Sequence, residues 1–221
     1  KQILPVESKA GNLYFIDVAG SKQSVIMIGK LALSARDENA NNLNFANEIL
    51  GGGSSGRLFQ TLRIEKGYTY GAYSGFSNSL EVAPFMVRTS VRANATLKSL
   101  KIIQEMLKSY SKDFSEADVE LTKNKLLKAD TRAFESLEAK LSMIRYMSKY
   151  NRPSDYAEKD QAELISMTLE DYKKVVDTYL QESEMIYLVV GDKATQLEEV
   201  KKLGKPVIEL DLYGNKITSV D

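Results

Sequence analysis

The sequence predicts an α+β fold with one mostly antiparallel β-sheet and helices packed on one face. Strand-like segments come first, a long helical region fills the middle, and a strand, a helix and a strand follow. This order does not alternate regularly, as it would in a doubly wound parallel sheet. No repeat, low-complexity tract or Pro/Gly/Ser-rich linker divides the chain. We therefore expect a single domain over residues 1–221.

The first strands are expected on either side of Gly20. Residues 12–18 and 23–33 are rich in Val, Ile, Leu and Tyr, and Gly20 and Ser21 between them are typical of a turn. We predict that these two strands pair with each other.

Two helices are expected next. Leucine and alanine at helical spacing predict a helix that opens at Arg36 and runs to Leu50, where three glycines stop it. Ser54 or Ser55 is expected to cap the following helix, residues 57–66.

An alternating pair of strands follows. Residues 69–77 alternate, with Tyr70, Ala72 and Ser74 predicted on one face, and residues 85–93 alternate again. This pattern predicts two neighbouring antiparallel strands. The rest of the chain is expected to be helical over 96–179, a strand over 184–190, a helix over 197–203 and a strand over 206–212.

The composition excludes several kinds of chemistry. Lys plus Arg and Asp plus Glu each number 30, so the net charge is zero and nucleic acid is not expected as the main partner. The chain contains no His and no Cys, which rules out a thiol nucleophile, an imidazole base and a Ser-His-Asp triad. Zinc prefers nitrogen and sulfur ligands, so we expect no metal site in this chain.

No apolar run reaches the roughly 20 residues that span a bilayer, and no membrane span is expected. The first residues, Lys-Gln-Ile-Leu-Pro, lack a signal-peptide pattern and resemble a segment cut from inside a longer protein.

Residues 50–75 carry the most informative motif. Gly51 to Gly56 has the spacing of a phosphate loop, but Arg57-Leu58 replaces the Lys and Ser/Thr that contact phosphate and magnesium, and a helix rather than a strand precedes it. A simpler interpretation is a helix end, a turn and an amphipathic helix whose apolar residues enter the core. In that case Arg63 would pair with a surface carboxylate and Tyr70 would fill a sheet face.

The same segment also follows the pattern of a known family. It comprises Leu50 to Gly53, Arg57-Leu58-Phe59, Leu62-Arg63, Gly67 and Tyr70. This set resembles the glycine-rich and arginine–tyrosine region in the C-terminal, non-zinc-binding domain of insulinase or pitrilysin-type zinc metallopeptidases, especially the branch with mitochondrial processing peptidase and its bacterial relatives. Residues 85–94, 189–192 and 203–214 fit as well, so the resemblance covers nearly the whole chain.

The resemblance implies one half of a two-domain clamshell that encloses a peptide. The first domain of such enzymes carries zinc on a His-x-x-Glu-His motif, and the second supplies an Arg and a Tyr seven residues apart. Carried over, Tyr70 would donate to the oxyanion and Arg63 would hold a substrate carbonyl. The glycine-rich segment would bind the substrate through Gly52, Gly53, Ser54, Ser55 and Arg57.

Zinc is therefore expected in a partner, either an N-terminal domain of the same polypeptide or a homologous subunit, and this chain alone is expected to be inactive. Two alternatives stay open: a non-catalytic structural or assembly subunit of the same fold, and a free-standing peptide-binding module. For the compartment, we expect the bacterial periplasm or cell envelope rather than the cytoplasm.

Overall fold

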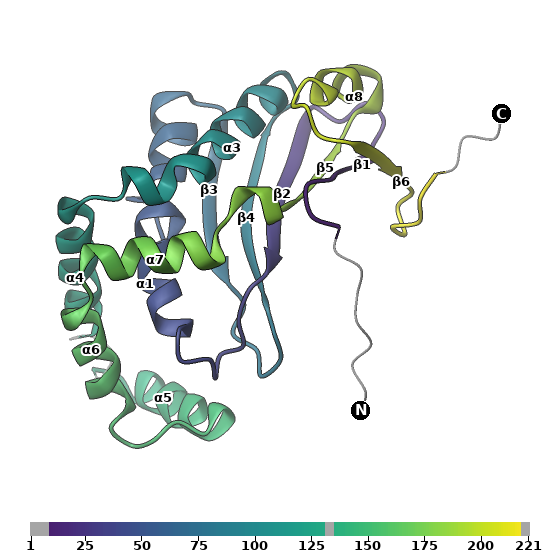
Figure 1. The fold of residues 1–221 in the computed structure, drawn as a ribbon. Helices are drawn as coiled ribbons and strands as arrows, with labels where there is room; N and C mark the ends of the chain where they lie inside the picture. The colour runs from purple at the N-terminus through teal and green to yellow at the C-terminus, as the bar shows by residue number, and fades with distance from the viewer. Residues whose placement is uncertain (1–8, 131–134, 218–221) are drawn as a thin grey trace.

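The computed structural model describes residues 9–130 and 135–217 (Figure 1). Six strands form one sheet in the order β3-β4-β2-β5-β1-β6. The strands are β1 (Leu13–Asp17), β2 (Gln23–Leu31), β3 (Thr69–Phe76), β4 (Pro84–Arg92), β5 (Ile186–Gly191) and β6 (Val207–Leu210). β1 runs parallel to both of its neighbours, and the other three pairs are antiparallel. The predicted α+β class with a mostly antiparallel sheet is confirmed.

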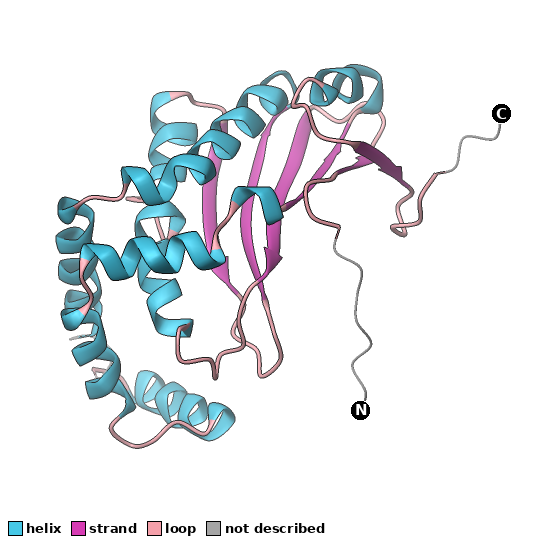
Figure 2. Ribbon diagram, viewed as in Figure 1, coloured by secondary structure: helices cyan, strands magenta, loops and turns pink. Residues whose placement is uncertain are grey.

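Helices cover one face of this sheet (Figure 2). They are α1 (Ala40–Gly51), α2 (Arg57–Phe59), the π-helix η1 (Gln60–Glu65), the 3-10 helix η2 (Ala93–Ala95), α3 (Thr96–Asp113), α4 (Glu116–Asp130), α5 (Leu137–Tyr150), α6 (Tyr156–Ser166), α7 (Leu169–Tyr179), the 3-10 helix η3 (Glu182–Glu184) and α8 (Lys193–Lys201). α3 passes in front of one end of the sheet and α7 lies in front of α1, whereas α5 lies at the far end of the helical layer (Figure 1). None of the helices in the described ranges combines the length and the hydrophobicity of a membrane span.

The alternation of each strand determines which of its residues enter the core. Successive side chains of a strand point to opposite faces, and the buried set of β2 is Ser24, Ile26 and Ile28. The helix-facing core also contains Leu13, Phe15, Leu43, Leu50, Phe85, Val87, Leu100, Ile103, Val176, Tyr187 and Val189. The opposite face of the sheet carries no described helix and is the open face of the domain (Figure 2).

The predicted pairing of residues 12–18 with residues 23–33 is wrong. β5 lies between β1 and β2 and pairs with both, parallel to β1 and antiparallel to β2. The connection between β1 and β2 spans two strand spacings, roughly 10 Å, which five residues cross easily. β1 and β2 are antiparallel in either arrangement, so the local pattern could not separate direct neighbours from strands with one strand between them.

The helical prediction needs correction at several helix ends. Arg36 to Asn39 form turns, and α1 begins only at Ala40. Neither Ser54 nor Ser55 caps the next helix: its N-cap is Gly56, without a side-chain cap bond. After one α-helical turn the chain continues as a π-helix, which sequence periodicity does not reveal. α8 begins at Lys193 rather than at Leu197.

The free edge of β3 is covered by α1. Asn47 donates from Nδ2 to the Ser74 carbonyl at 3.0 Å, and the Ser74 hydroxyl donates to Oδ1 of Asn47 at 2.6 Å. A Cβ on Gly51 would lie 2.4 Å from the backbone nitrogen of Ser74, so only glycine allows α1 to approach this closely. An exposed strand edge invites pairing with other chains, and this contact protects it.

Candidate functional site

The segment that links α1 to β3 brings the predicted arginine and tyrosine together. Arg63 lies in η1, and Gly67 then reverses the chain with a φ of 62°, in the left-handed region. The Tyr68 N–H donates to the Leu62 carbonyl at 2.9 Å and closes the end of the helix. Tyr70 then lies near the start of β3. The predicted helix, glycine turn and strand are therefore present in this order.

Arg63 lies against the ring of Tyr70. The guanidinium carbon is 4.8 Å from the ring centroid, a cation–π distance, and Nη1 donates to the Thr69 carbonyl at 3.3 Å. These two contacts orient the guanidinium without a carboxylate. The alternative in which Arg63 pairs with a surface carboxylate finds no support among the described residues.

A β-bulge turns Tyr70 away from the core. Thr69 is opposite Val91 and Ala72 is opposite Thr89, so three steps along β3 match two steps along β4. As a result, Tyr70 is 83% exposed, whereas Ala72 and Ser74 are buried. The predicted common face of Tyr70, Ala72 and Ser74 is therefore wrong. The alternative in which Tyr70 fills a sheet face finds no support either, because its side chain is exposed.

Threonine hydroxyls hold the bulge. The Thr69 hydroxyl accepts from the Gly71 N–H at 3.0 Å and donates to the Ser90 carbonyl at 2.7 Å. The Thr89 hydroxyl lies 3.0 Å from that of Thr69 and 2.9 Å from the Gly71 carbonyl. Neither threonine could be singled out from the sequence, because a bulge depends on how two strands are aligned and not on the pattern of one strand.

The arrangement of Arg63 and Tyr70 can act on a group that comes from outside. The phenol is solvent-exposed and makes no hydrogen bond to another described residue. A phenol can donate one proton in a hydrogen bond, and a guanidinium offers five donors in a fixed fork. The adjacent pair can therefore bind an oxygen that carries partial or full negative charge.

The glycine-rich segment is largely occupied by packing. A Cβ on Gly56 would lie 2.9 Å from Cα of Gly51, and one on Gly52 would meet the side chain and Cα of Glu48 at 2.3 to 2.8 Å. At Gly53 the nearest atom would be Nζ of Lys125, at 3.2 Å.

The two serines of this segment are exposed. The Ser54 carbonyl accepts from Nε2 of Gln60 at 2.7 Å, and the Ser55 hydroxyl accepts from Nζ of Lys125 at 3.0 Å. Their hydroxyls and the exposed backbone of Gly52 remain accessible, and a role of Gly52, Gly53, Ser54 and Ser55 in substrate binding stays a prediction.

Arg57 contacts a carboxylate, a backbone carbonyl and an aromatic ring. Its Nη2 donates to the Asp118 carboxylate at 2.8 Å and to the Asp113 carbonyl at 2.9 Å, at the end of α3. Its guanidinium carbon lies 5.5 Å from the ring centroid of Tyr110, whose pKa is raised by burial. These contacts give Arg57 a structural position between α2, α3 and α4. Its predicted role in substrate binding stays a prediction.

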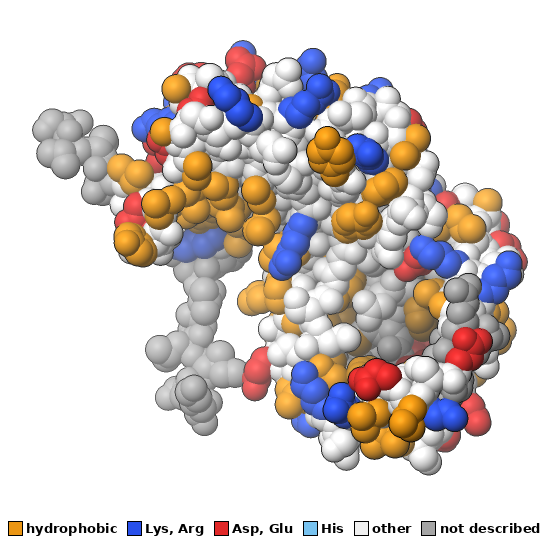
Figure 3. Space-filling view, turned by 180° about the vertical axis from the view of Figure 1, so that it is seen from behind, with side chains coloured by type: hydrophobic (Ala, Val, Ile, Leu, Met, Phe, Trp, Pro, Cys, Tyr) orange, Lys and Arg blue, Asp and Glu red, His pale blue; other side chains and the backbone are white. Residues whose placement is uncertain are grey.

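The open face of the sheet carries apolar and basic side chains. Val25 and Leu31 of β2 are 37% and 64% exposed, respectively, and both strand neighbours of Val25 are buried. Figure 3 views the molecule from behind and shows groups of hydrophobic side chains on this surface, with scattered Lys and Arg. β4 contributes Arg88 and Arg92 to this face, in a strand where the alternating residues 85, 87, 89 and 91 are buried. The sequence analysis did not single out these arginines.

The described part of the chain contains no group of three His, Cys, Asp or Glu side chains that could hold a metal ion. The site thus consists of an exposed phenol and a guanidinium, placed on the rim of an open sheet, without ligands for a metal of its own.

Comparisons with known proteins identify the class. The sequence profile described as the peptidase M16 inactive domain matches residues 2–126, more than half of the chain. The chain therefore belongs to the peptidase M16 inactive-domain family, and the metallopeptidase resemblance is confirmed.

Relatives and solved structures agree with this assignment. An uncharacterized zinc protease of Bacillus subtilis (strain 168) is 28% identical over 123 residues, which cover 55% of this chain and 30% of the relative. A second uncharacterized zinc protease, from Streptomyces coelicolor, is 32% identical over 94 residues, covering 42% of this chain and 20% of the relative.

The crystal structure of a peptidase M16 inactive domain from Pseudomonas fluorescens superposes with a TM-score of 0.77 and 26% identity, over 87% of this chain and 46% of the other. A protease from Helicobacter pylori has the same fold, with a TM-score of 0.72 and 15% identity, over 86% of this chain and 48% of the other. The matched region thus spans less than half of each of these relatives.

Proposed function

We propose that this chain is the half of a zinc metallopeptidase that binds the peptide and assists the transition state. In this proposal Arg63 and Tyr70 face a zinc site on a partner. The partner is either a His-x-x-Glu-His domain of the same polypeptide or a homologous subunit. The observation that carries the proposal is the pairing of a half-buried arginine with an exposed tyrosine: Arg63 lies 4.8 Å from the Tyr70 ring centroid and has no carboxylate partner among the described residues.

The division of labour follows from the residues present. The partner's zinc would supply an activated water at the peptide carbonyl. Tyr70 would donate its phenolic hydrogen bond to the oxyanion that forms, and Arg63 would hold a neighbouring carbonyl of the substrate. The bulge at Thr69 serves this role, because it points the phenol out of the sheet toward an incoming substrate.

Two further findings support the proposal. The relatives are named zinc proteases, whereas the described residues of this chain offer no metal site, so a metal would have to be held elsewhere. The matched region covers only part of each relative, which leaves room for a second half. We extend the proposal to the bacterial periplasm or cell envelope as the compartment.

The test is steady-state kinetics on the complete protein, with both halves present and this chain alone as the inactive control. Tyr70→Phe keeps the ring and removes only the hydroxyl, which acts mainly in the transition state. We expect kcat to fall by about 10²-fold or more, with little change in KM. Arg63→Ala is expected to raise KM as well, because Arg63 holds the substrate before and during the reaction.

Tyr213→Phe is the matched control, because Tyr213 is 91% exposed and lies beyond β6, outside the proposed site. Equal and small effects at Tyr70 and Tyr213 would contradict the catalytic role of Tyr70. Absence of any activity in the complete protein would favour the alternative of a structural or assembly subunit.

A further inference from the structure

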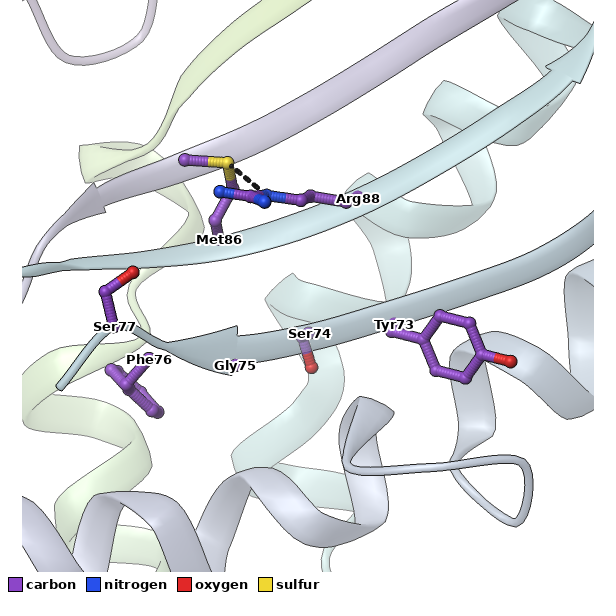
Figure 4. Close-up of a pocket in the computed structure, with 7 residues that line it drawn as sticks. All are labelled: Tyr73, Ser74, Gly75, Phe76, Ser77, Met86 and Arg88. Atoms are coloured by element: carbon purple, nitrogen blue, oxygen red, sulfur yellow. Dashed lines mark hydrogen bonds between the residues drawn. The ribbon is translucent and has the colours of Figure 1, made fainter.

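A cavity of about 310 Å³ lies on the β3–β4 pair, further along β3 than Tyr70 (Figure 4). Its lining residues are Tyr73, Ser74, Gly75, Phe76, Ser77, Met86 and Arg88. Gly75 forms its floor: a Cβ built on this residue would meet no atom within 4 Å. The hollow thus exists because the strand has no side chain at this position.

Arg88 is the only charged residue among the residues that line this cavity. It is opposite Tyr73 in the β3–β4 register and is exposed. Its Nε lies 3.0 Å from Sδ of Met86, and Figure 4 shows the two side chains together on the same side of the strand. Within the described ranges Arg88 makes no ion pair. The four N–H donors of its terminal nitrogens are thus available to a ligand.

Two other arginines of the chain, in contrast, form ion pairs. Arg57 pairs with Asp118, and Arg152 pairs with Asp160. A thioether is a weak acceptor and does not neutralise a guanidinium. A carboxylate would satisfy the charge with two parallel hydrogen bonds, and Met86 would contact the methylene groups next to it.

The position of the cavity relates it to the proposed catalytic pair. Gly75 follows Tyr70 by five residues, which is roughly 16 Å along a strand that rises about 3.3 Å per residue. An extended peptide has nearly the same rise. A side chain in the cavity would therefore belong to a residue about five positions from the bond that faces Tyr70.

We propose that this cavity is a subsite for an acidic side chain of an extended peptide, with Arg88 as the residue that binds the carboxylate. The distance from the cleaved bond rests on the proposed function, whereas recognition of the carboxylate at Arg88 does not. The subsite predicts a preference for Glu or Asp at one position of the peptide, several residues away from the cleaved bond.

The test is NMR of the 221-residue chain labelled with ¹³C at the methionine methyl groups, with the Met86 signal assigned from a Met86→Leu variant. The probes are two unstructured 12-residue peptides with blocked ends, identical except for a single central Glu or Gln. We expect the Glu peptide to shift the Met86 methyl signal in a saturable manner, with at least about tenfold tighter binding than the Gln peptide.

Two variants test the assignment and one is the control. Arg88→Gln removes the charge. Gly75→Leu fills the cavity, and its Cβ would meet no atom within 4 Å. We expect each variant to lose the preference for Glu and to keep the melting temperature of the native chain. Arg92→Gln removes an exposed charge four residues further along β4 and should leave the preference intact.

A Met86 signal that responds to neither peptide, or responds equally to both, would overturn the subsite. So would an equal loss of the preference in Arg92→Gln, because it would show a diffuse charge effect. A carboxylate preference at Arg88 combined with no kinetic effect of Tyr70→Phe would retain the subsite and reject the catalytic proposal.

Discussion

Arg57 and Arg63 lie six residues apart in one segment but have opposite surroundings. Arg57 is held by a carboxylate, a carbonyl at the end of α3 and an aromatic ring. Among the residues that the structure describes, Arg63 contacts the Tyr70 ring and one strand carbonyl and no carboxylate. The same residue type is thus paired with a carboxylate in one place and, among the described residues, has no carboxylate partner in the other. A match to the motif cannot make this distinction, whereas the partners of each guanidinium can.

The largest effect on stability is expected at Gly51, where α1 packs against β3. Gly51→Ala places a Cβ 2.4 Å from the Ser74 backbone and 2.8 Å from Leu58. We expect a loss of about 3 kcal/mol in the free energy of unfolding, because neither the strand nor the helix can move aside cheaply. The measurement is urea denaturation followed by circular dichroism.

Gly53→Ala is the control, since its Cβ would meet only the flexible end of Lys125 at 3.2 Å. We expect it to cost less than about 1 kcal/mol, the ordinary range for a surface substitution. A similar loss in both variants would mean that the whole glycine segment is a packing element. A small loss at Gly51 would show that α1 can withdraw from β3.

The second prediction concerns the buried carboxylate of Glu182, which lies in η3 just before β5. Glu182 is 8% exposed and accepts hydrogen bonds from Tyr187, from Lys205 at 2.9 Å and from Gln104 at 3.3 Å. Burial alone would raise the pKa of Glu182, but the hydrogen bonds from Tyr187 and Lys205 together hold this pKa below its ordinary value of 4.5. Glu182→Gln leaves Lys205 without its carboxylate, and we expect a loss of about 2 kcal/mol at pH 7.

The pH dependence of this loss has a definite sign. Because the pKa of Glu182 is lowered by folding, its contribution is complete above pH 4.5 and is lost as the pH falls through the folded value. The stability difference between the native protein and Glu182→Gln should therefore shrink below pH 4.5.

Glu184→Gln is the exposed counterpart: Glu184 pairs with Lys30 but its side chain is 49% exposed, so the loss should stay below about 1 kcal/mol. Denaturation at several pH values measures all of these differences. A difference for Glu182→Gln that stays constant down to pH 3 would disagree with the assigned pKa direction.

The third prediction contrasts the two arginines directly and has the smallest effect on stability. Arg57→Leu leaves Asp118, whose side chain is 15% exposed, without its cation, and we expect a loss of about 1 to 2 kcal/mol. Arg63→Leu removes no carboxylate contact and should change stability by less than about 0.5 kcal/mol. Thermal unfolding of both variants provides the measurement. A reversed ranking would mean that Arg63 is the structural residue and would weaken its proposed role.

The helical and strand segments could be predicted because each follows from local periodicity. The buried alternation of residues 85–91 and the position of Gly67 at a helix end are of this kind. The neighbours of β1 could not be predicted, because they depend on residues more than 170 positions away, in β5. The π-helix and the bulge at Thr69 also depend on contacts between elements, and the periodicity of the sequence does not predict them.

The sequence by itself determined the α+β class, the family, the lack of imidazole and thiol ligands, and the spacing that puts Arg63 and Tyr70 on either side of a glycine turn. Only the tertiary structure decided which arginines are paired with a carboxylate. It ties Arg57 to Asp118, turns Tyr70 outward through a bulge and leaves Arg88 above the hollow at Gly75. The physical reason is that residue types and spacing act locally, whereas the partner of a charge is supplied by whichever distant segment packs beside it.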